Sequence, residues 1–336
     1  MNNNLWSPAC ALDTWKLRVD LLHKVRAFFL THGSLEVETP CLARAIGTDP
    51  HLDYLETRSF VDGITADPGI PLYLCTSPEF HLKRLLAAGW GDIWQLCKAF
   101  RGGESGPRHN PEFSILEWYR VGWDWNQLMD EVVLLCTNLA QGLPSPSAAL
   151  ARNASSKISW CDAYRVHCGV DALNCSTQDL QFAAERLGIP CLSDSSREEW
   201  LDYLMVAAIE PNLGKKGPEF LVAYPAAQAA LAQIETGPND FAWARRFELY
   251  LDGVELCNGY QELVDPIEQA RRFHADLELR SSMGKRIPHF DENFLAALSH
   301  GMPACSGVAL GFDRLVMLLL GKETLGDVLT FPVERA

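Results

Sequence analysis

A loop rich in glycine and basic residues constrains the fold of this chain more than any other stretch. Residues 101–110 read RGGESGPRHN and contain three glycines, one proline, two arginines and a histidine. Glycine costs about 1 kcal/mol and proline about 3 kcal/mol inside a helix, so this run is not helical. The flanking segments 93–97 and 113–119 alternate in polarity, as strands do. The sequence predicts a long hairpin whose basic loop is either functional or a solvated surface turn.

Composition narrows the class of protein. The 336 residues are 48% hydrophobic and 21% charged, as in an ordinary globular protein with one large α/β or α+β domain or two smaller ones. A net charge of −14 argues against broad nucleic-acid binding but not against a local basic site. The N-terminus lacks the pattern of a signal peptide, and no window approaches ~18 consecutive apolar residues. We expect a cytoplasmic protein with no membrane contact.

The N-terminal segment is predicted to form a helix followed by a short strand. Leucine, valine and phenylalanine recur on one helical face of residues 13–32. Asp13 is the expected N-cap and Gly33 the expected stop. Residues 34–40 follow as a strand that ends at Pro40. This arrangement suits either a subunit interface or the edge of a core.

A strand at residues 72–75 is followed by a helix-start signal. Pro78 suits the first helical position and Glu79 suits the first turn, where the helix dipole favours an anion. The helix is expected over 78–88, closed by Gly89. Glu79 is either a dipole-stabilising residue or a group placed to meet a cationic ligand.

The middle of the chain changes in character. Residues 125–139 have the pattern of an apolar amphipathic helix, and 141–157 have the composition of a linker. Residues from about 160 to 217 are again helical in pattern. We interpret this last segment as an insertion or a small subdomain.

A second hairpin is predicted around residues 252–253, because Asp-Gly is a strong turn signal between strands. Glu248, Glu255 and Glu262 recur every seven residues along it. A bulge at 258–259 would let them converge. Acidic groups among apolar strands are costly without a cationic partner. They form a magnesium or ammonium site, or else a surface face.

The C-terminal part is predicted to be a glycine-bearing strand, 305–311, that leads into an apolar helix. Arg314 lies in the first turn of that helix, where the dipole disfavours a cation, so we expect an anionic partner. The chain has neither a GxxxxGK[ST] sequence nor a GxGxxG after a strand. Any nucleotide is therefore bound without a P-loop or a Rossmann crevice.

Five motifs in this order resemble the class II aminoacyl-tRNA synthetases. ETP at 38–40, the hairpin of 97–120 and GVALGFDR at 307–314 resemble motifs 1, 2 and 3 of that family. TSPEFHLKRLL at 76–86 and ELCNGYQEL at 255–263 are similar to its lysyl-tRNA synthetase branch. The resemblance covers essentially the whole chain. It implies an α+β fold, in which helices flank a mostly antiparallel sheet.

The resemblance is to a catalytic core rather than to a whole lysyl-tRNA synthetase. Motif 1 begins at Glu38, which leaves no room for the family's N-terminal OB-fold anticodon-binding domain. Such a chain resembles the stand-alone paralogues that activate (R)-β-lysine with ATP and transfer it to a lysine of elongation factor P. Ala309 fits them, since full lysyl-tRNA synthetases have glycine there. The expected organisation is one catalytic domain, 1–336, with the helical insertion at about 160–217.

The resemblance also implies cofactors and a nucleotide site. ATP and Mg²⁺ are expected, with Glu248 and Glu255 as the metal ligands. Arg101 and Arg314 are the expected catalytic residues: Arg101 contacts the α-phosphate and the substrate carboxylate, and Arg314 holds the γ-phosphate. Phe113 is expected to stack on adenine. The implied ATP-binding residues are Arg101, Gly102, Gly103, Glu104, His109, Asn110, Phe113, Glu255, Leu256, Gly311 and Arg314.

The implied amino acid pocket is acidic. Carboxylates suit a substrate with two ammonium groups, (R)-β-lysine or possibly α-lysine, and each paired contact contributes ~1.5–3 kcal/mol. Elongation factor P is the expected partner, tRNA is not, and motif 1 implies a homodimer. The implied substrate-binding residues are Ser77, Pro78, Glu79, Glu117, Tyr119, Asn258, Tyr260, Glu262 and Ala309.

One departure and two alternatives stay open. Motif 2 of the family has Arg-x-Glu, but here Gly103 stands at the glutamate position. Either Glu104 replaces it through a loop shift, or backbone groups of Gly102 and Gly103 contact adenine. The alternative functions are a minimal tRNA-acylating enzyme and a non-catalytic regulator. The presence of Arg101 and Arg314 disfavours the regulator.

Overall fold

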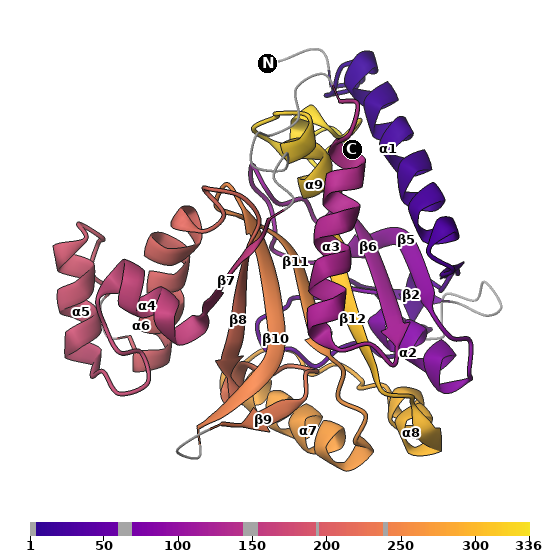
Figure 1. Ribbon diagram of the computed structural model, residues 1–336. Helices are drawn as coiled ribbons and strands as arrows, with labels where there is room; N and C mark the ends of the chain where they lie inside the picture. Colours follow the sequence, from indigo (N-terminus) through magenta and orange to yellow (C-terminus); the bar gives the residue numbers. More distant parts are fainter. Residues whose placement is uncertain (1–4, 60–68, 144–153, 193–194, 238–240) are drawn as a thin grey trace.

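A mostly antiparallel sheet forms the centre of the molecule. The computed structural model describes residues 5–59, 69–143, 154–192, 195–237 and 241–336. Within these ranges nine strands form one sheet in the order β1-β5-β6-β12-β11-β10-β8-β7, with β9 paired to β10 (Figure 1). The strands are β1 (Leu35–Glu36), β5 (Ile93–Phe100), β6 (Glu112–Val121), β7 (Ser156–Ser159), β8 (Glu219–Pro225), β9 (Ile234–Thr236), β10 (Ala242–Leu251), β11 (Val254–Gln261) and β12 (Cys305–Gly311).

Helices cover this sheet in three groups, each with its own buried cluster. Figure 1 shows α4 to α6 as a lobe beside β7 and β8, while α1 and α3 lie along the sheet. A third cluster joins α2, α7 and α8. The α+β architecture expected from the sequence is thus confirmed. The helices are α1 (Leu12–Thr31), α2 (Glu79–Ala87), α3 (Trp125–Ala140), α4 (Trp160–Cys168), α5 (Thr177–Arg186), α6 (Arg197–Leu204), α7 (Pro266–Ser282), α8 (Glu292–Gly301) and α9 (Phe312–Leu319).

The basic hairpin is formed as expected. β5 and β6 pair without a break from Ile93 opposite Tyr119 to Phe100 opposite Glu112. The Arg101 amide donates to the Pro111 carbonyl at 2.9 Å and closes the loop. The strands before this hairpin in the chain form a second, smaller sheet, in the order β2 (Leu42–Ala43), β4 (Ile70–Leu74) and β3 (Glu56–Ser59). The hairpin loop is therefore held at the end of two long, regularly paired strands.

The first helix and strand differ in detail from expectation. The N-cap of α1 is Ala11, in extended conformation and without a side-chain cap, so the prediction that Asp13 caps the helix is wrong. Asp13 lies in the first turn instead, where it still favours the helix dipole. Gly33 ends the helix with φ +70°, as predicted. The strand after it is limited to β1, which pairs parallel to β5.

The predicted bulge was placed at the wrong residues. The register between β10 and β11 shifts at Leu249 and Tyr250, not at 258–259. Gly259 serves another purpose, because a Cβ there would overlap the ring of Phe247 on the facing strand. The glycine is needed for close packing rather than for a bend.

The start of α2 differs by one residue from the prediction, and the helices of the lobe agree with it. Pro78 is the N-cap of α2 rather than its first residue, and the helix begins at Glu79. The helical character of the segment from about 160 to 217 is confirmed by α4 to α6, the short π-helix Met205–Ile209 and the 3₁₀-helix Glu210–Asn212. Most of the predicted linker, residues 144–153, lies outside the described residues. In the described parts of the chain, no helix combines the length and apolarity needed to cross a membrane.

Candidate active site

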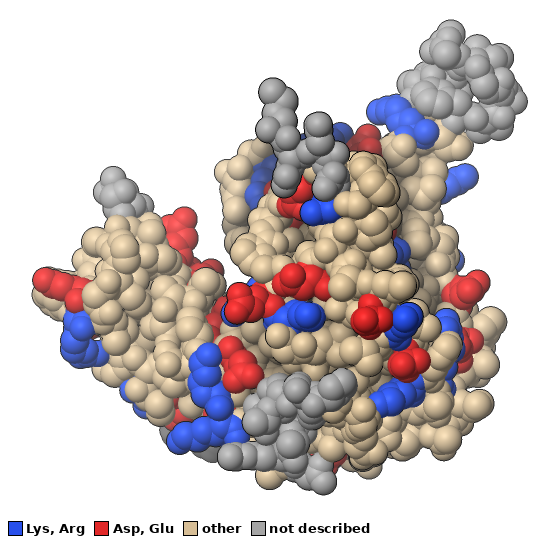
Figure 2. All heavy atoms as spheres, turned by 90° about the horizontal axis from the view of Figure 1, so that it is seen from above, with Lys and Arg blue, Asp and Glu red and all other residues tan. Residues whose placement is uncertain are grey.

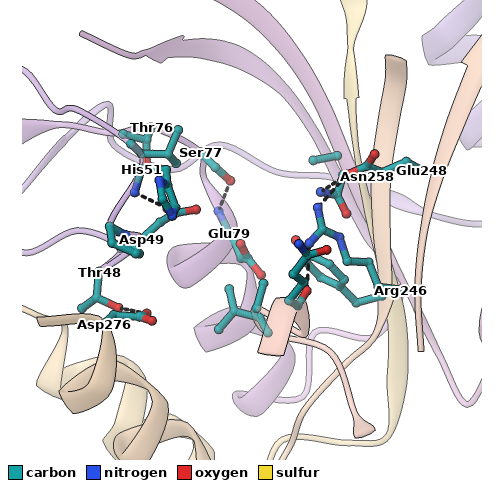
Figure 3. Close-up of a pocket in the computed structure, with 18 of the residues that line it drawn as sticks. Thr48, Asp49, His51, Thr76, Ser77, Glu79, Arg246, Glu248, Asn258 and Asp276 are labelled. Carbon is teal, nitrogen blue, oxygen red and sulfur yellow. Dashed lines mark hydrogen bonds and ion pairs between the residues drawn. The ribbon is translucent and has the colours of Figure 1, made fainter. Parts of the chain in front are cut away.

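A cavity of about 680 Å³ opens between the sheet, α2 and the α4–α6 lobe. Figure 3 shows Thr76, Ser77 and Glu79 on one side and Arg246, Glu248 and Asn258 on the other. Most of the predicted substrate residues line it: Ser77, Glu79, Glu117, Tyr119, Asn258, Tyr260, Glu262 and Ala309. The sheet therefore brings together residues that are distant in the sequence.

Glu117 lies at the floor of this cavity and is 1% exposed. The Ser77 hydroxyl donates to its Oε2 at 2.7 Å, and the Tyr119 hydroxyl donates to its Oε1 at 2.7 Å. Burial and the nearby Glu79 raise the pKa of Glu117 to about 8. Both oxygens thus have a neutral donor, and a cation from outside would complete the site.

Glu79 and Glu262 share a lysine. The Lys83 ammonium lies 2.6 Å from Glu79 Oε1 and 2.6 Å from Glu262 Oε2. Glu262 is 1% exposed, and burial raises its pKa to about 7 despite the opposing effect of Lys83. The cavity wall therefore holds three carboxylates close to Tyr119.

Two small residues of β12 allow this close arrangement. A Cβ at Gly307 would overlap both the Tyr119 ring and Glu262 Oε1. Ala309 lies opposite Glu117 on β6 and Asn258 on β11, at the centre of the three strands. A side chain larger than alanine at this position would fill the cavity between these two polar groups.

Glu248 belongs to a separate polar group on the other wall. Its Oε1 accepts from Arg246 at 2.6 Å and from Asn258 at 3.4 Å, and its Oε2 accepts from the Tyr250 hydroxyl at 2.8 Å. The Arg246 guanidinium also lies over the ring of Tyr224, 4.3 Å from its centroid. Burial and the Glu248 charge raise the pKa of Glu255 on the neighbouring strand.

Arg101 links the cavity to the hairpin loop. It lines the cavity, and its guanidinium carbon lies 5.0 Å from the centroid of the Phe113 ring. Its Nη1 lies 3.8 Å from Glu104 Oε1. Its Nε is buried without a hydrogen-bond partner in the described chain. A guanidinium held this way has donors available for an anion.

Arg314 forms the second basic group, outside the cavity lining. Its Nη2 lies 2.7 Å from His109 Nε2, and its Nη1 donates to the Glu255 carbonyl at 3.0 Å and to Glu255 Oε2 at 3.3 Å. Burial and the Arg314 charge lower the pKa of His109, so the imidazole is neutral and accepts from the arginine. Gly311 adjoins the same arginine.

Several predicted residues take structural contacts instead of lining the cavity. Asn110 is buried, and its side chain donates to the Glu112 carbonyl and accepts from the Val333 amide. Leu256 is 2% exposed and packs in the core. Pro78 is buried at the start of α2. The Gly102 amide donates to the Asp53 carbonyl at 2.8 Å and is therefore already hydrogen-bonded. The predicted contact between adenine and the backbone of Gly102 and Gly103 stays a prediction.

Comparisons with known proteins agree with this architecture. The family described as tRNA synthetases class II (D, K and N) matches residues 9–335. The chain belongs to the class II tRNA synthetase family. It is 43% identical over 333 residues to Elongation factor P–(R)-beta-lysine ligase of Hamiltonella defensa subsp. Acyrthosiphon pisum (strain 5AT), with 98% of each chain covered. Proteins with that same name from Salmonella dublin and Salmonella typhimurium (strain LT2) are 44% identical over 98% of each chain.

Three residues of this class II synthetase site escaped the sequence reasoning. Lys83 is four residues after Glu79 on a helix, and Arg246 is two residues before Glu248 on a strand. Each spacing places the two side chains on one face, so the sequence contained an indication of both pairs. Glu210, from the turn that ends the α4–α6 lobe, gave none. It lines the cavity and lies 3.4 Å from the Tyr250 hydroxyl, and burial beside Glu248 raises its pKa to about 7.

The carboxylates of this class II synthetase fit a magnesium ion that also binds phosphate. Within the described residues no group of three or more His, Cys, Asp or Glu side chains forms a complete metal site. The charge of Glu248 contributes to the raised pKa of Glu255, so the two carboxylates repel each other. A divalent cation beside them would relieve this repulsion. Mg²⁺ is commonly held by one or two carboxylates together with substrate phosphates.

Proposed function

We propose that this chain is an ATP-dependent ligase that activates (R)-β-lysine and transfers it to a lysine ε-amino group of elongation factor P. The observation that carries the proposal is the cavity, which Arg101 lines together with the buried carboxyl groups of Glu117 and Glu262 and the partly buried one of Glu79. Relatives that share 43–44% of its residues over 98% of their length bear the corresponding name. The protein would act in the cytoplasm.

The first step would join the amino acid to AMP. A substrate carboxylate oxygen attacks the α-phosphorus of ATP and forms a new P–O bond. The bond from the α-phosphorus to the oxygen that bridges to the β-phosphate breaks, and pyrophosphate leaves. Arg101, whose Nε has no partner among the described residues, is placed to neutralise the charge that grows on the α-phosphate. Arg314 and the neutral His109 would hold the terminal phosphate. The adenine ring would stack on the ring of Phe113.

Mg²⁺ fits this step at Glu248 and Glu255. When bound, it would supply positive charge to the phosphate oxygens and complete its coordination with them. Burial and the Glu248 charge raise the pKa of Glu255, and a divalent cation bound beside it would oppose both effects. These two residues are therefore the proposed metal ligands.

The amino acid would be recognised through its two ammonium groups. Glu79, Glu117 and Glu262 supply the charge, while Ser77 and Tyr119 orient Glu117. Asn258, Tyr260 and Ala309 would complete the pocket. Paired ammonium–carboxylate contacts contribute ~1.5–3 kcal/mol each, so a substrate lacking one ammonium group binds much more weakly.

The second step would make an amide bond. The neutral ε-amine of the acceptor lysine attacks the acyl carbon of the adenylate, AMP leaves, and the nitrogen loses a proton. Figure 2 shows acidic and basic side chains interleaved near the middle of the visible face, not a uniform basic surface. That charge pattern and the net charge of −14 favour a protein acceptor over tRNA.

One experiment separates the candidate functions. The protein is incubated with ATP, Mg²⁺, β-lysine, elongation factor P and tRNA together, and both macromolecules are examined by mass spectrometry. We expect elongation factor P alone to gain one β-lysyl group. A gain on tRNA alone would support the minimal tRNA ligase. No gain, together with no ATP–pyrophosphate exchange, would support the non-catalytic regulator.

A second measurement tests the choice of amino acid. We expect β-lysine to support ATP–pyrophosphate exchange better than α-lysine. An equal or reversed preference would contradict the assignment of β-lysine while leaving the ligase chemistry intact.

A further inference from the structure

A buried lysine lies behind the amino acid pocket, and the proposed reaction does not use it. The Lys83 side chain is 0% exposed, and it is not among the residues that line the cavity. Its ammonium lies between Glu79 and Glu262, 2.6 Å from an oxygen of each. It also lies 5.8 Å from the centroid of the Phe294 ring.

This ammonium remains charged although it is buried. Burial alone lowers the pKa of a lysine, but the Glu262 and Glu79 charges outweigh it and raise the pKa of Lys83 above its usual value. The i,i+4 spacing on α2 fixes Lys83 against Glu79. The contact with Glu262 joins the helix to the end of β11, which lies far away in the sequence.

The charges of this region match a diamino acid. The Glu79, Glu117 and Glu262 charges all act on Tyr119, and Lys83 is the cation that contacts two of these three carboxylates. The group as a whole therefore has a net charge of two negative units when all its members are ionised. Lysine and β-lysine each carry two ammonium groups.

We propose that Lys83 is a fixed counter-cation that sets the charge and position of the pocket carboxylates, so that the pocket accepts two substrate ammonium groups. It binds Oε1 of Glu79 and Oε2 of Glu262, which leaves the second oxygen of each for the substrate. Glu262 Oε1 faces Gly307 and Tyr119, toward the cavity. Lys83 is thus a positioning residue, and its role rests on the proposed function.

Removal of Lys83 would leave Glu79 and the buried Glu262 without their shared cation, next to the buried Glu117. One of them would take up a proton, because an unpaired buried charge is costly. Burial already raises the pKa of Glu262 to about 7 and that of Glu117 to about 8. The other titratable groups that face this cluster are Cys97, Tyr119, Tyr260 and Cys305. A protonated carboxyl binds an ammonium group poorly.

The test is Lys83→Met, which keeps an unbranched side chain of similar length and removes the charge. At pH 7 we expect the KM for β-lysine in ATP–pyrophosphate exchange to rise about tenfold or more, with the KM for ATP within about twofold. By pH 9 the difference in KM from the parent protein should shrink to about threefold, because the carboxyls ionise. Lys98→Met, at an exposed position on β5, is the matched control and should change neither constant.

A second variant keeps the test decisive if Lys83→Met does not fold. Lys83→Met/Glu79→Gln removes both charges of the helical pair and restores the net charge of the cluster. We expect it to fold and to bind β-lysine at least about threefold more tightly at pH 7 than the single variant, or measurably if the single variant is unfolded. A double variant that does not fold, or that binds no better than the single variant, overturns the inference.

The outcomes also separate this inference from the proposed function. If the parent protein does not adenylate β-lysine, the proposed function is wrong. If the parent protein is active and Lys83→Met loses kcat or thermal stability at an unchanged KM for β-lysine, only the role given to Lys83 is wrong.

Discussion

Arg101 is the residue on which the proposed chemistry depends most. It reaches from the hairpin loop into the cavity and keeps a buried Nε without a partner in the described chain. Arg101→Ala should reduce ATP–pyrophosphate exchange by about 10²–10³-fold or more, since removal of one charge-stabilising donor has effects of this size. Lys98→Ala, at an exposed position on the same hairpin, should retain normal exchange. Near-normal exchange in Arg101→Ala would refute the role proposed for it.

Gly307 provides a test of the pocket's dimensions. A Cβ at this position would overlap the Tyr119 ring and Glu262 Oε1. Gly307→Ala should therefore displace both groups, raise the KM for the amino acid about tenfold and cost ~1–3 kcal/mol of stability. Gly106→Ala is a suitable control, because a Cβ there has no neighbour within 4 Å among the described residues. Equal KM values for the two variants would show that the pocket can adapt.

The pocket carboxyls predict how binding depends on pH. Burial raises the pKa of Glu117 to about 8 and that of Glu262 to about 7, so a larger fraction of both carboxyls is protonated at pH 6.5 than at pH 8.5. These protons must leave before ammonium groups bind. The KM for the amino acid should fall about tenfold between pH 6.5 and 8.5. A flat profile would contradict the raised pKa values.

The same groups predict the opposite trend for the stability of the free protein. The pKa values of Glu117 and Glu262 in the folded state lie above the unfolded value of about 4.3. The stability that these two protonated carboxyls contribute to the folded state is therefore fully present below about pH 4.3. It is lost as the pH rises through 7 and 8. The melting temperature of the free protein should therefore decrease from pH 6.5 to 8.5, and added β-lysine should reduce this decrease.

Among the elements, α1 and α9 are joined by a buried ion pair. Arg18 of α1 is 4% exposed, and its Nη2 lies 2.5 Å from Asp313 Oδ1 at the start of α9. Asp313 Oδ2 also accepts from the Ser114 amide of β6 at 2.7 Å. The pair thus connects the N-terminal helix to both the hairpin and the turn that carries Arg314.

Loss of this connection should be costly. Arg18→Met leaves Asp313 buried without its cation, and we expect a loss of ~3–5 kcal/mol in the free energy of unfolding. Arg26→Met, on the same helix, removes an exposed pair with Glu36 and should cost less than ~1 kcal/mol. Chemical denaturation measures both. Equal losses would mean that the buried pair has no special importance.

The elements also show what the sequence could predict. The β5–β6 hairpin and the existence of α2 follow from local patterns, and the structure contains both, with α2 beginning one residue later than predicted. The position of the bulge in β11 does not follow from local patterns, because the register shift opposite Leu249 and Tyr250 is set by the pairing of two strands. Lys83 had a local partner in Glu79, but its second partner, Glu262, becomes a neighbour only in the folded sheet. Pairing across strands is the information that one-dimensional periodicity lacks.

At the scale of the whole molecule, we propose a homodimer formed through the motif 1 region. The structure leaves large apolar side chains exposed there: Leu30 at 79%, Leu35 at 52% and Leu42 at 44%. Sedimentation equilibrium should give twice the mass of the chain. Leu30→Glu should shift the equilibrium toward monomer, while Leu187→Glu, on the distant lobe, should not. A monomeric parent protein would contradict the proposal.

The strand order has a consequence for how the protein is made. β12 is the last strand of the described chain, yet it lies in the middle of the sheet, between β6 and β11. Until the ribosome has released residues 305–311, the strands of the first half and those of the second half have no common neighbour. Each half then exposes an unpaired edge, which favours association with other chains. The nascent protein should therefore depend on chaperones until residues 305–311 have left the ribosome.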